Sequence, residues 1–141
     1  MKESLFIKDI YLINSLFFLF PIDTADITMK YINRALKKYG DFQSINLIHI
    51  NLHLNYSLML IKNKSEDKAL AYLQEILPLT KKYKLGVQMG INYIRQGICY
   101  ENLKYNMDFD YLNKGLNILN ALEETEIIEL MKNEISKNIR K

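Results

Sequence analysis

Cysteine, proline and glycine are scarce in this sequence of 141 residues, which contains one, two and five of them. The single cysteine, Cys99, excludes a disulfide bond within the chain and suits a reducing compartment. The few prolines and glycines leave little turn-forming sequence, and no long alternating run rich in Val and Thr is present. Helical periodicity dominates instead, which predicts an all-α protein.

The chain also lacks a strong net charge. Its formal charge is +3 at pH 7, with 25% charged and 49% hydrophobic residues, as in an ordinary globular domain. The densest basic cluster contains Lys81, Lys82 and Lys84, and cations of this kind favour a helix C-terminus. We therefore expect one domain over residues 1–141 and no direct binding to nucleic acid.

A long uninterrupted hydrophobic run is missing as well. Lys8 and Asp9 interrupt the apolar N-terminal stretch, and the run from Ile10 to Ile22 is shorter than the roughly 20 residues of a bilayer span. Glu3 and Asp9 do not fit the basic start of a signal peptide. These features predict a cytoplasmic protein without a membrane segment.

The apolar spacing and the breaks between apolar segments predict seven helices. They span residues 3–20, 24–39, 43–62, 66–83, 87–103, 107–121 and 125–138. Pro78 falls inside the fourth of these segments, and we expect it to kink or shorten that helix because proline removes a backbone donor.

The second, fourth and sixth predicted helices share a pattern that measures an internal repeat. Ile32, Leu73 and Leu112 are separated by 73 − 32 = 41 and 112 − 73 = 39 residues, so the unit is about 40 residues long. A unit of two helices cannot bury its own apolar face and must stack on its neighbours. The predicted architecture is therefore a short superhelix of three helical hairpins, about 3–40, 43–84 and 87–122, with a closing helix at 125–138.

Two segments resemble tetratricopeptide repeats. SEDKALAYLQEIL (65–77) is similar to the second helix of that repeat, with Ala69, Leu73 and Ile76 at its packing positions. RQGICYENLKY (95–105) is similar to the first helix, with Gly97 at the position of close helix approach. The resemblance implies a tetratricopeptide-like right-handed superhelix.

More narrowly, the chain resembles the C-terminal sensor domain of PlcR-type regulators, a peptide-responsive group of bacterial transcription factors. The resemblance rests on LNYSLML (54–60), YIRQGICYENLKY (93–105) and a closing LMKNEISK (130–137). In that family a short peptide is secreted, reimported and bound, and it alters the dimeric state of an attached helix-turn-helix domain. This chain starts inside the repeat region, so the resemblance implies a sensor module that does not itself bind DNA.

Polar residues in the first helix of each hairpin align when the repeat is applied. Asn14, Asn55 and Arg95 are separated by 55 − 14 = 41 and 95 − 55 = 40 residues, and Asn92 corresponds to Asn51 at 92 − 51 = 41. Two helical stripes contain these residues of the third and fifth helices. The stripe on the third helix comprises Asn51, Asn55 and Lys62, and the stripe on the fifth comprises Gln88, Asn92, Arg95, Cys99 and Asn102. We expect these stripes to line the concave face of the superhelix.

Such a ladder suits an extended peptide. An asparagine amide can donate and accept a hydrogen bond at once, and arginine can hold a carboxylate through two parallel bonds. Tyr11, Tyr56 and Tyr93 would add apolar walls with a polar tip.

The resemblance adds two assignments to this ladder. In the PlcR-type family, asparagines that match Asn14 and Asn55 contact the signalling peptide. The predicted peptide-binding site comprises Asn14, Asn51, Asn55, Lys62, Gln88, Asn92 and Arg95.

Other residue patterns favour neither catalysis nor metal binding. His49 and His53 are four residues apart, but Ile50 stands where an HExxH motif has glutamate, and no third ligand is near in sequence. Cys99 has no basic partner in the sequence and is expected to be a plain helix-face thiol. We therefore expect no enzyme, no metal and no cofactor. A generic tetratricopeptide scaffold for protein partners, or a fragment of a full-length regulator, is the alternative function.

The first predicted helix, 3–20, carries apolar side chains on all sides. One packed face would use about half of them, so a second surface must cover the remainder. We expect a homodimer with this helix in the interface, or a mixed dimer with a full-length regulator.

Overall fold

The computed structural model describes residues 21–39 and 43–140 of the chain, which form six α-helices and no strand. The helices are α2 (Ile22–Tyr39), α3 (Gln43–Lys62), α4 (Glu66–Lys82), α5 (Gly86–Asn102), α6 (Tyr111–Ala121) and α7 (Thr125–Asn138). The all-α prediction is confirmed for these residues. The predicted helix 3–20 and its dimer interface lie outside the described residues. None of the described helices is long and apolar enough to cross a membrane.

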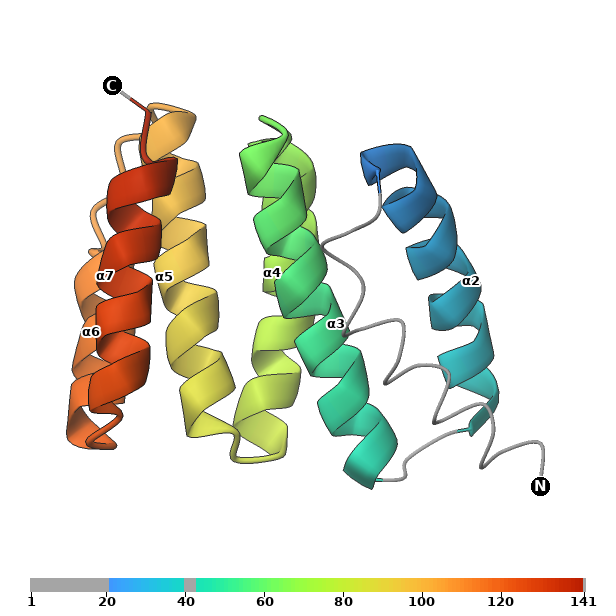
Figure 1. Cartoon of the computed structure of the whole chain (residues 1–141). Helices are drawn as coiled ribbons and strands as arrows, with labels where there is room; N and C mark the ends of the chain where they lie inside the picture. The colour runs from blue at the N-terminus through green and yellow to red at the C-terminus, as the bar shows by residue number, and fades with distance from the viewer. Residues whose placement is uncertain (1–20, 40–42, 141) are drawn as a thin grey trace.

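The helices stack side by side, with α2 at one end of the array and α7 at the other (Figure 1). Helix α3 packs against α2, α4 and α5, whereas α5 packs against α3, α4, α6 and α7. Neighbours on four sides bury nine consecutive residues of α5, from Asn92 to Tyr100. This helix is the centre of the described structure, so its polar residues lie between helices.

Four helices, α3 to α6, end in the same kind of turn. The second residue after each helix has a positive φ: Lys64 at 61°, Lys84 at 56°, Lys104 at 61° and Glu123 at 60°. Each turn contains paired backbone hydrogen bonds, such as Tyr105 N–H to the Tyr100 carbonyl and Lys104 N–H to the Glu101 carbonyl, which satisfy the last carbonyls of the helix. The turns recur at 104 − 64 = 40 and 123 − 84 = 39 residues, the same period as the sequence pattern.

The expected start of the sixth helix is wrong. Helix α6 begins at Tyr111 rather than at residue 107, because the side chain of Asp110 accepts a hydrogen bond from the backbone N–H of Asn113 and caps the helix there. Helix α4 continues through Pro78 to Lys82, so proline does not shorten it. Tertiary packing of α4 between α3 and α5 stabilises the helix across the missing hydrogen bond.

Helices α5 and α6 approach each other closely at glycine. A Cβ atom on Gly115 would lie 2.5 Å from the carbonyl oxygen of Gly90 and 2.5 Å from Cγ1 of Ile94. A Cβ atom on Gly97 would lie 3.0 Å from the backbone nitrogen of Leu112. The close approach expected at Gly97 is thus present, and it places α6 directly on α5.

Candidate functional site

The polar stripe of α3 reaches the surface of the array. Between residues 50 and 61, every side chain is buried except those of Asn51 and Asn55, which are half-buried and one turn apart. Lys62 continues the stripe and is exposed. No described residue hydrogen-bonds the side chain of Asn51. The third helix therefore presents two amides and an ammonium group along one line, as its spacing predicts.

The matching position on α5 has a different environment, because Arg95 is only 7% exposed. Its Nε and Nη2 atoms donate to the two carboxylate oxygens of Glu134 on α7, each at 2.9 Å. Its Nη1 atom donates to the carbonyl oxygen of Leu54 on α3 at 2.6 Å. One guanidinium therefore joins three helices, and a carboxylate of the same chain occupies the position predicted for a ligand carboxylate.

Asn92 is also held inside the protein. Its Nδ2 atom donates to the carbonyl oxygen of Leu73 on α4 at 2.9 Å, and its Oδ1 atom accepts from Nε2 of Gln96 at 2.7 Å. Both amides are buried, so these bonds satisfy groups that would otherwise be costly to desolvate. The expectation of one open polar stripe on α5 is therefore wrong for Asn92 and Arg95, because four neighbouring helices enclose α5.

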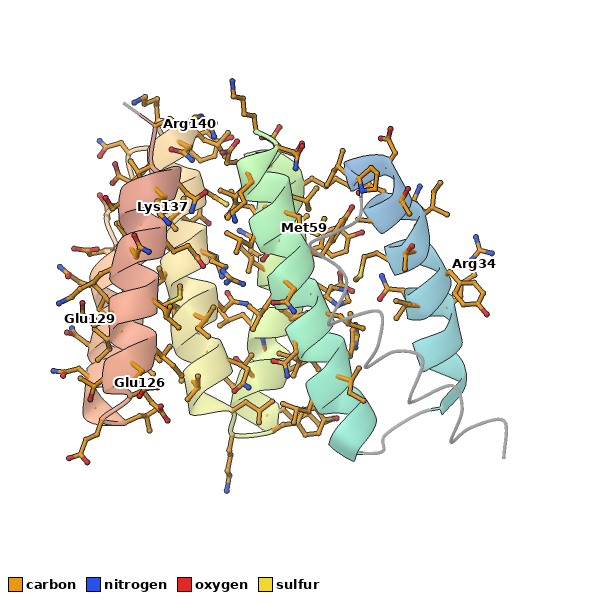
Figure 2. The ribbon with its side chains drawn as sticks, in the orientation of Figure 1. Arg34, Met59, Glu126, Glu129, Lys137 and Arg140 are labelled. Carbon is orange, nitrogen blue, oxygen red and sulfur yellow. The ribbon has the colours of Figure 1, made fainter. Side chains whose placement is uncertain are left out.

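A second polar network fixes the C-terminal segment to the end of α5. Asn102 donates to the Glu66 carboxylate and to the carbonyl oxygen of Asn138, and it accepts from the backbone N–H of Arg140. Arg140 also pairs with Glu66, and Figure 2 shows Arg140 at the end of α7, beside α5. Burial acts to raise the pKa of Glu66, but the hydrogen bonds from Arg140 and Asn102 outweigh it and lower the pKa below its usual value.

The remaining predicted residues divide between surface and interior. Gln88 is half-buried in the first turn of α5, and Asn14 lies outside the described residues. Tyr56 is fully buried and packs edge-on against Tyr72 on α4, so it forms no wall of an open groove. Tyr93 faces Phe109 and Tyr111 instead, on the side of α5 covered by α4 and α6.

The histidine pair lies at the margin of the packed interior, with His53 buried and His49 half-buried. The rings of His49 and His53 are 4.3 Å apart, and Nδ1 of His53 hydrogen-bonds the carbonyl oxygen of His49 at 2.9 Å. Burial, with a smaller contribution from the neighbouring His49, lowers the pKa of His53 to about 4. No group of three His, Cys, Asp or Glu side chains that could hold a metal occurs within residues 21–39 and 43–140.

Cys99 lies in the core rather than on an open helix face, so that expectation is also wrong. Its side chain is completely buried, and burial raises the pKa of the thiol to about 12. The buried thiol therefore remains protonated at neutral pH.

Comparisons with protein-family models, with curated proteins and with solved structures give no match for this chain.

Proposed function

We propose that this chain is a tetratricopeptide-like module that binds a short, extended peptide across the layer formed by α3, α5 and α7. The observation that carries the proposal is the pair of asparagines on α3. Asn51 and Asn55 are the two residues between positions 50 and 61 whose side chains are not buried, and they lie on one face of the helix.

The chemistry of this surface suits a peptide backbone. An extended peptide has unpaired N–H and C=O groups on both edges, and each carboxamide can donate to one and accept from the other. Exposed Lys62 and half-buried Gln88 extend the polar surface at opposite ends of the layer. The proposed contacts are therefore Asn51, Asn55, Lys62 and Gln88, with Asn14 as the preceding member of the ladder.

Asn92 and Arg95 have a supporting role in this proposal. Arg95 binds Leu54 and Glu134, and Asn92 binds Leu73, so together they connect α5 to α3, α4 and α7. Helices fixed in this way hold surface amides in constant positions, which lowers the entropic cost of binding.

The resemblance to PlcR-type sensors supports a signalling peptide as the ligand and a cytoplasmic location. In this proposal the module forms a homodimer through residues 3–20, or a mixed dimer with a full-length regulator, and peptide binding changes that association. No catalytic step, cofactor or nucleic acid forms part of the proposal.

The proposal can be tested by selecting peptides from a phage-displayed heptapeptide library on the full chain. Selected peptides are then titrated calorimetrically against the wild type and against Asn51→Ala and Asn55→Ala. Loss of one amide contact is expected to weaken binding about tenfold, which corresponds to ~1.4 kcal/mol. Asn117→Ala is the matched control, since Asn117 is an exposed asparagine on α6. Equal affinities of the wild type and both α3 variants would contradict the proposed site.

A further inference from the structure

A groove of about 470 Å³ lies between α4 and α6, with α5 as its floor. Pro78 and Lys81 line it from α4, Tyr93 and Gln96 from α5, and Phe109 and Tyr111 from the start of α6 and the preceding loop. Its size and its apolar lining with few polar groups are typical of ligand sites. Its residues on α5 are Tyr93 and Gln96, whereas the α5 residue of the peptide surface proposed above is Gln88.

Aromatic rings form one end of this groove. The ring of Phe109 packs edge-on against Tyr111 at 4.8 Å between centroids, and Tyr93 lies 6.3 Å from Phe109 and 6.1 Å from Tyr111. Phe109 is nevertheless 46% exposed. Three neighbouring rings, one of them partly open, offer further edge-on or stacked contacts to an aromatic group in the groove.

Two lysines place positive charge beside these rings. Nζ of Lys81 lies 6.0 Å from the Tyr93 centroid, and Nζ of Lys114 lies 5.8 Å from the same centroid and 6.0 Å from that of Phe109. Neither lysine forms an ion pair with any residue of the described part of the chain. The two ammonium groups approach one ring from α4 and α6, so an anion in the groove would find both of them nearby.

The groove also has hydrogen-bond acceptors. Gln96 is 2% exposed, its Nε2 atom donates to Asn92, and no described residue donates to its carbonyl oxygen. Pro78 has no N–H, so the backbone carbonyl of Gln74, another residue of the groove, lacks its usual helical donor. These two oxygens can accept a hydrogen bond from a ligand that carries an N–H group.

We propose that this groove binds the C-terminal residue of a peptide that ends in an aromatic side chain. The aromatic ring would pack on Phe109, Tyr111 and Tyr93, and the terminal carboxylate would pair with Lys81 and Lys114. The amide N–H of the same residue would donate to Gln96. A C-terminal aromatic residue combines these three groups within one residue, so it matches the groove without any contribution from α3.

The test uses nuclear magnetic resonance titration of the full chain with acetyl-Gly-Gly-Phe that has a free carboxylate. The expected result is saturable binding with a dissociation constant of about 1 mM or tighter, with shifts at the Gln96 side-chain amide and at residues 109–114. The amide-capped peptide and acetyl-Gly-Gly-Ala are each expected to bind at least about fivefold more weakly, because each lacks one recognised group.

The matched variants separate this groove from other sites. The double variant Lys81→Gln/Lys114→Gln should weaken binding of the acid about fivefold or more, whereas Lys82→Gln, on the same helix as Lys81, should not. Equal binding of the acid and its amide would overturn the proposal, as would equal binding of acetyl-Gly-Gly-Phe and acetyl-Gly-Gly-Ala. Asn55→Ala should leave this binding unchanged, so failure here and failure of the α3 peptide surface are distinguishable.

Discussion

Arg95 on α5 and Glu134 on α7 form a buried ion pair with two parallel hydrogen bonds. Their side chains are 9% and 13% exposed, and both bonds measure 2.9 Å. The residues are 39 positions apart, almost one repeat length. The pair attaches α7 to α5, while the third bond of Arg95 continues to the Leu54 carbonyl on α3.

Removing one partner of this pair should destabilise the fold strongly. Glu134→Ala leaves the Arg95 guanidinium buried with one partner fewer, and we expect a loss of about 3 kcal/mol in the free energy of unfolding. Urea denaturation followed by circular dichroism measures the loss. Glu129→Ala is the control. Glu129 is exposed on the same helix, and its ion pair with exposed Lys132, at 4.0 Å, is expected to contribute little to stability.

A double variant tests whether the loss arises from an unpaired charge. Arg95→Met/Glu134→Leu removes both charges, and it should lose less stability than Glu134→Ala alone. A double variant less stable than the single variant would show that the pair contributes more than its own desolvation cost, contrary to this explanation.

The contact between α5 and α6 should tolerate no side chain at Gly115. Alanine there would place Cβ 2.5 Å from a backbone oxygen of α5, which can move only with the whole helix. We expect Gly115→Ala to lower the free energy of unfolding by at least about 2 kcal/mol, despite the better helix propensity of alanine. At Gly86 the nearest atom is Cδ1 of exposed Leu122, which can rotate away, so Gly86→Ala should change stability by less than about 1 kcal/mol.

His53 should make the protein less stable in mild acid. Its pKa is about 4 when folded and 6.5 in the reference state, so the unfolded chain binds a proton first as the pH falls. Stability is therefore fully present above about pH 6.5 and is lost progressively towards pH 4, by an amount on the order of 3 kcal/mol. Denaturation midpoints across this range should fall less steeply for His53→Gln than for the wild type, and parallel curves would contradict the assignment.

Cys99 should resist thiol reagents until the protein unfolds. Because burial raises its pKa to about 12, little thiolate is present in the folded state. At about pH 8, reaction with a disulfide reagent is expected to be about a thousandfold slower for the folded than for the urea-unfolded chain. A rate that matches the unfolded chain would show that the thiol is open to solvent.

Local sequence signals predicted the helices better than they predicted the environment of polar side chains. The bounds of α3 and α7 agree with the sequence prediction, and the 40-residue period recurs in the turns at Lys64 and Lys104. The start of α6 was predicted wrongly because several polar residues precede the apolar segment, and the sequence alone does not show that Asp110 is the one that caps the helix. Helix bounds and the repeat period depend on residues that are close in sequence, so apolar periodicity and capping residues predict most of them.

The position of Arg95 depends on residues far away in the sequence. Spacing places Asn55 and Arg95 at equivalent sites, but it does not reveal that Glu134 of α7 forms an ion pair with Arg95. The aromatic groove was missed for the same reason, since Tyr93 and Phe109 come from different segments and meet only after α6 packs on α5. A helical stripe defines which residues share a face, and the neighbouring helices decide whether that face meets solvent.

Hydrogen–deuterium exchange of the full chain, with and without a selected heptapeptide, shows directly which helices the peptide covers. If the peptide lies on the layer of α3, α5 and α7, protection should increase in α3 around Asn51 and Asn55 and in the first turn of α5 around Gln88. At a peptide concentration near the wild-type dissociation constant, Asn55→Ala should strongly reduce this protection. Protection confined to residues 105–115, or increased nowhere in α3, would contradict a peptide site on this layer.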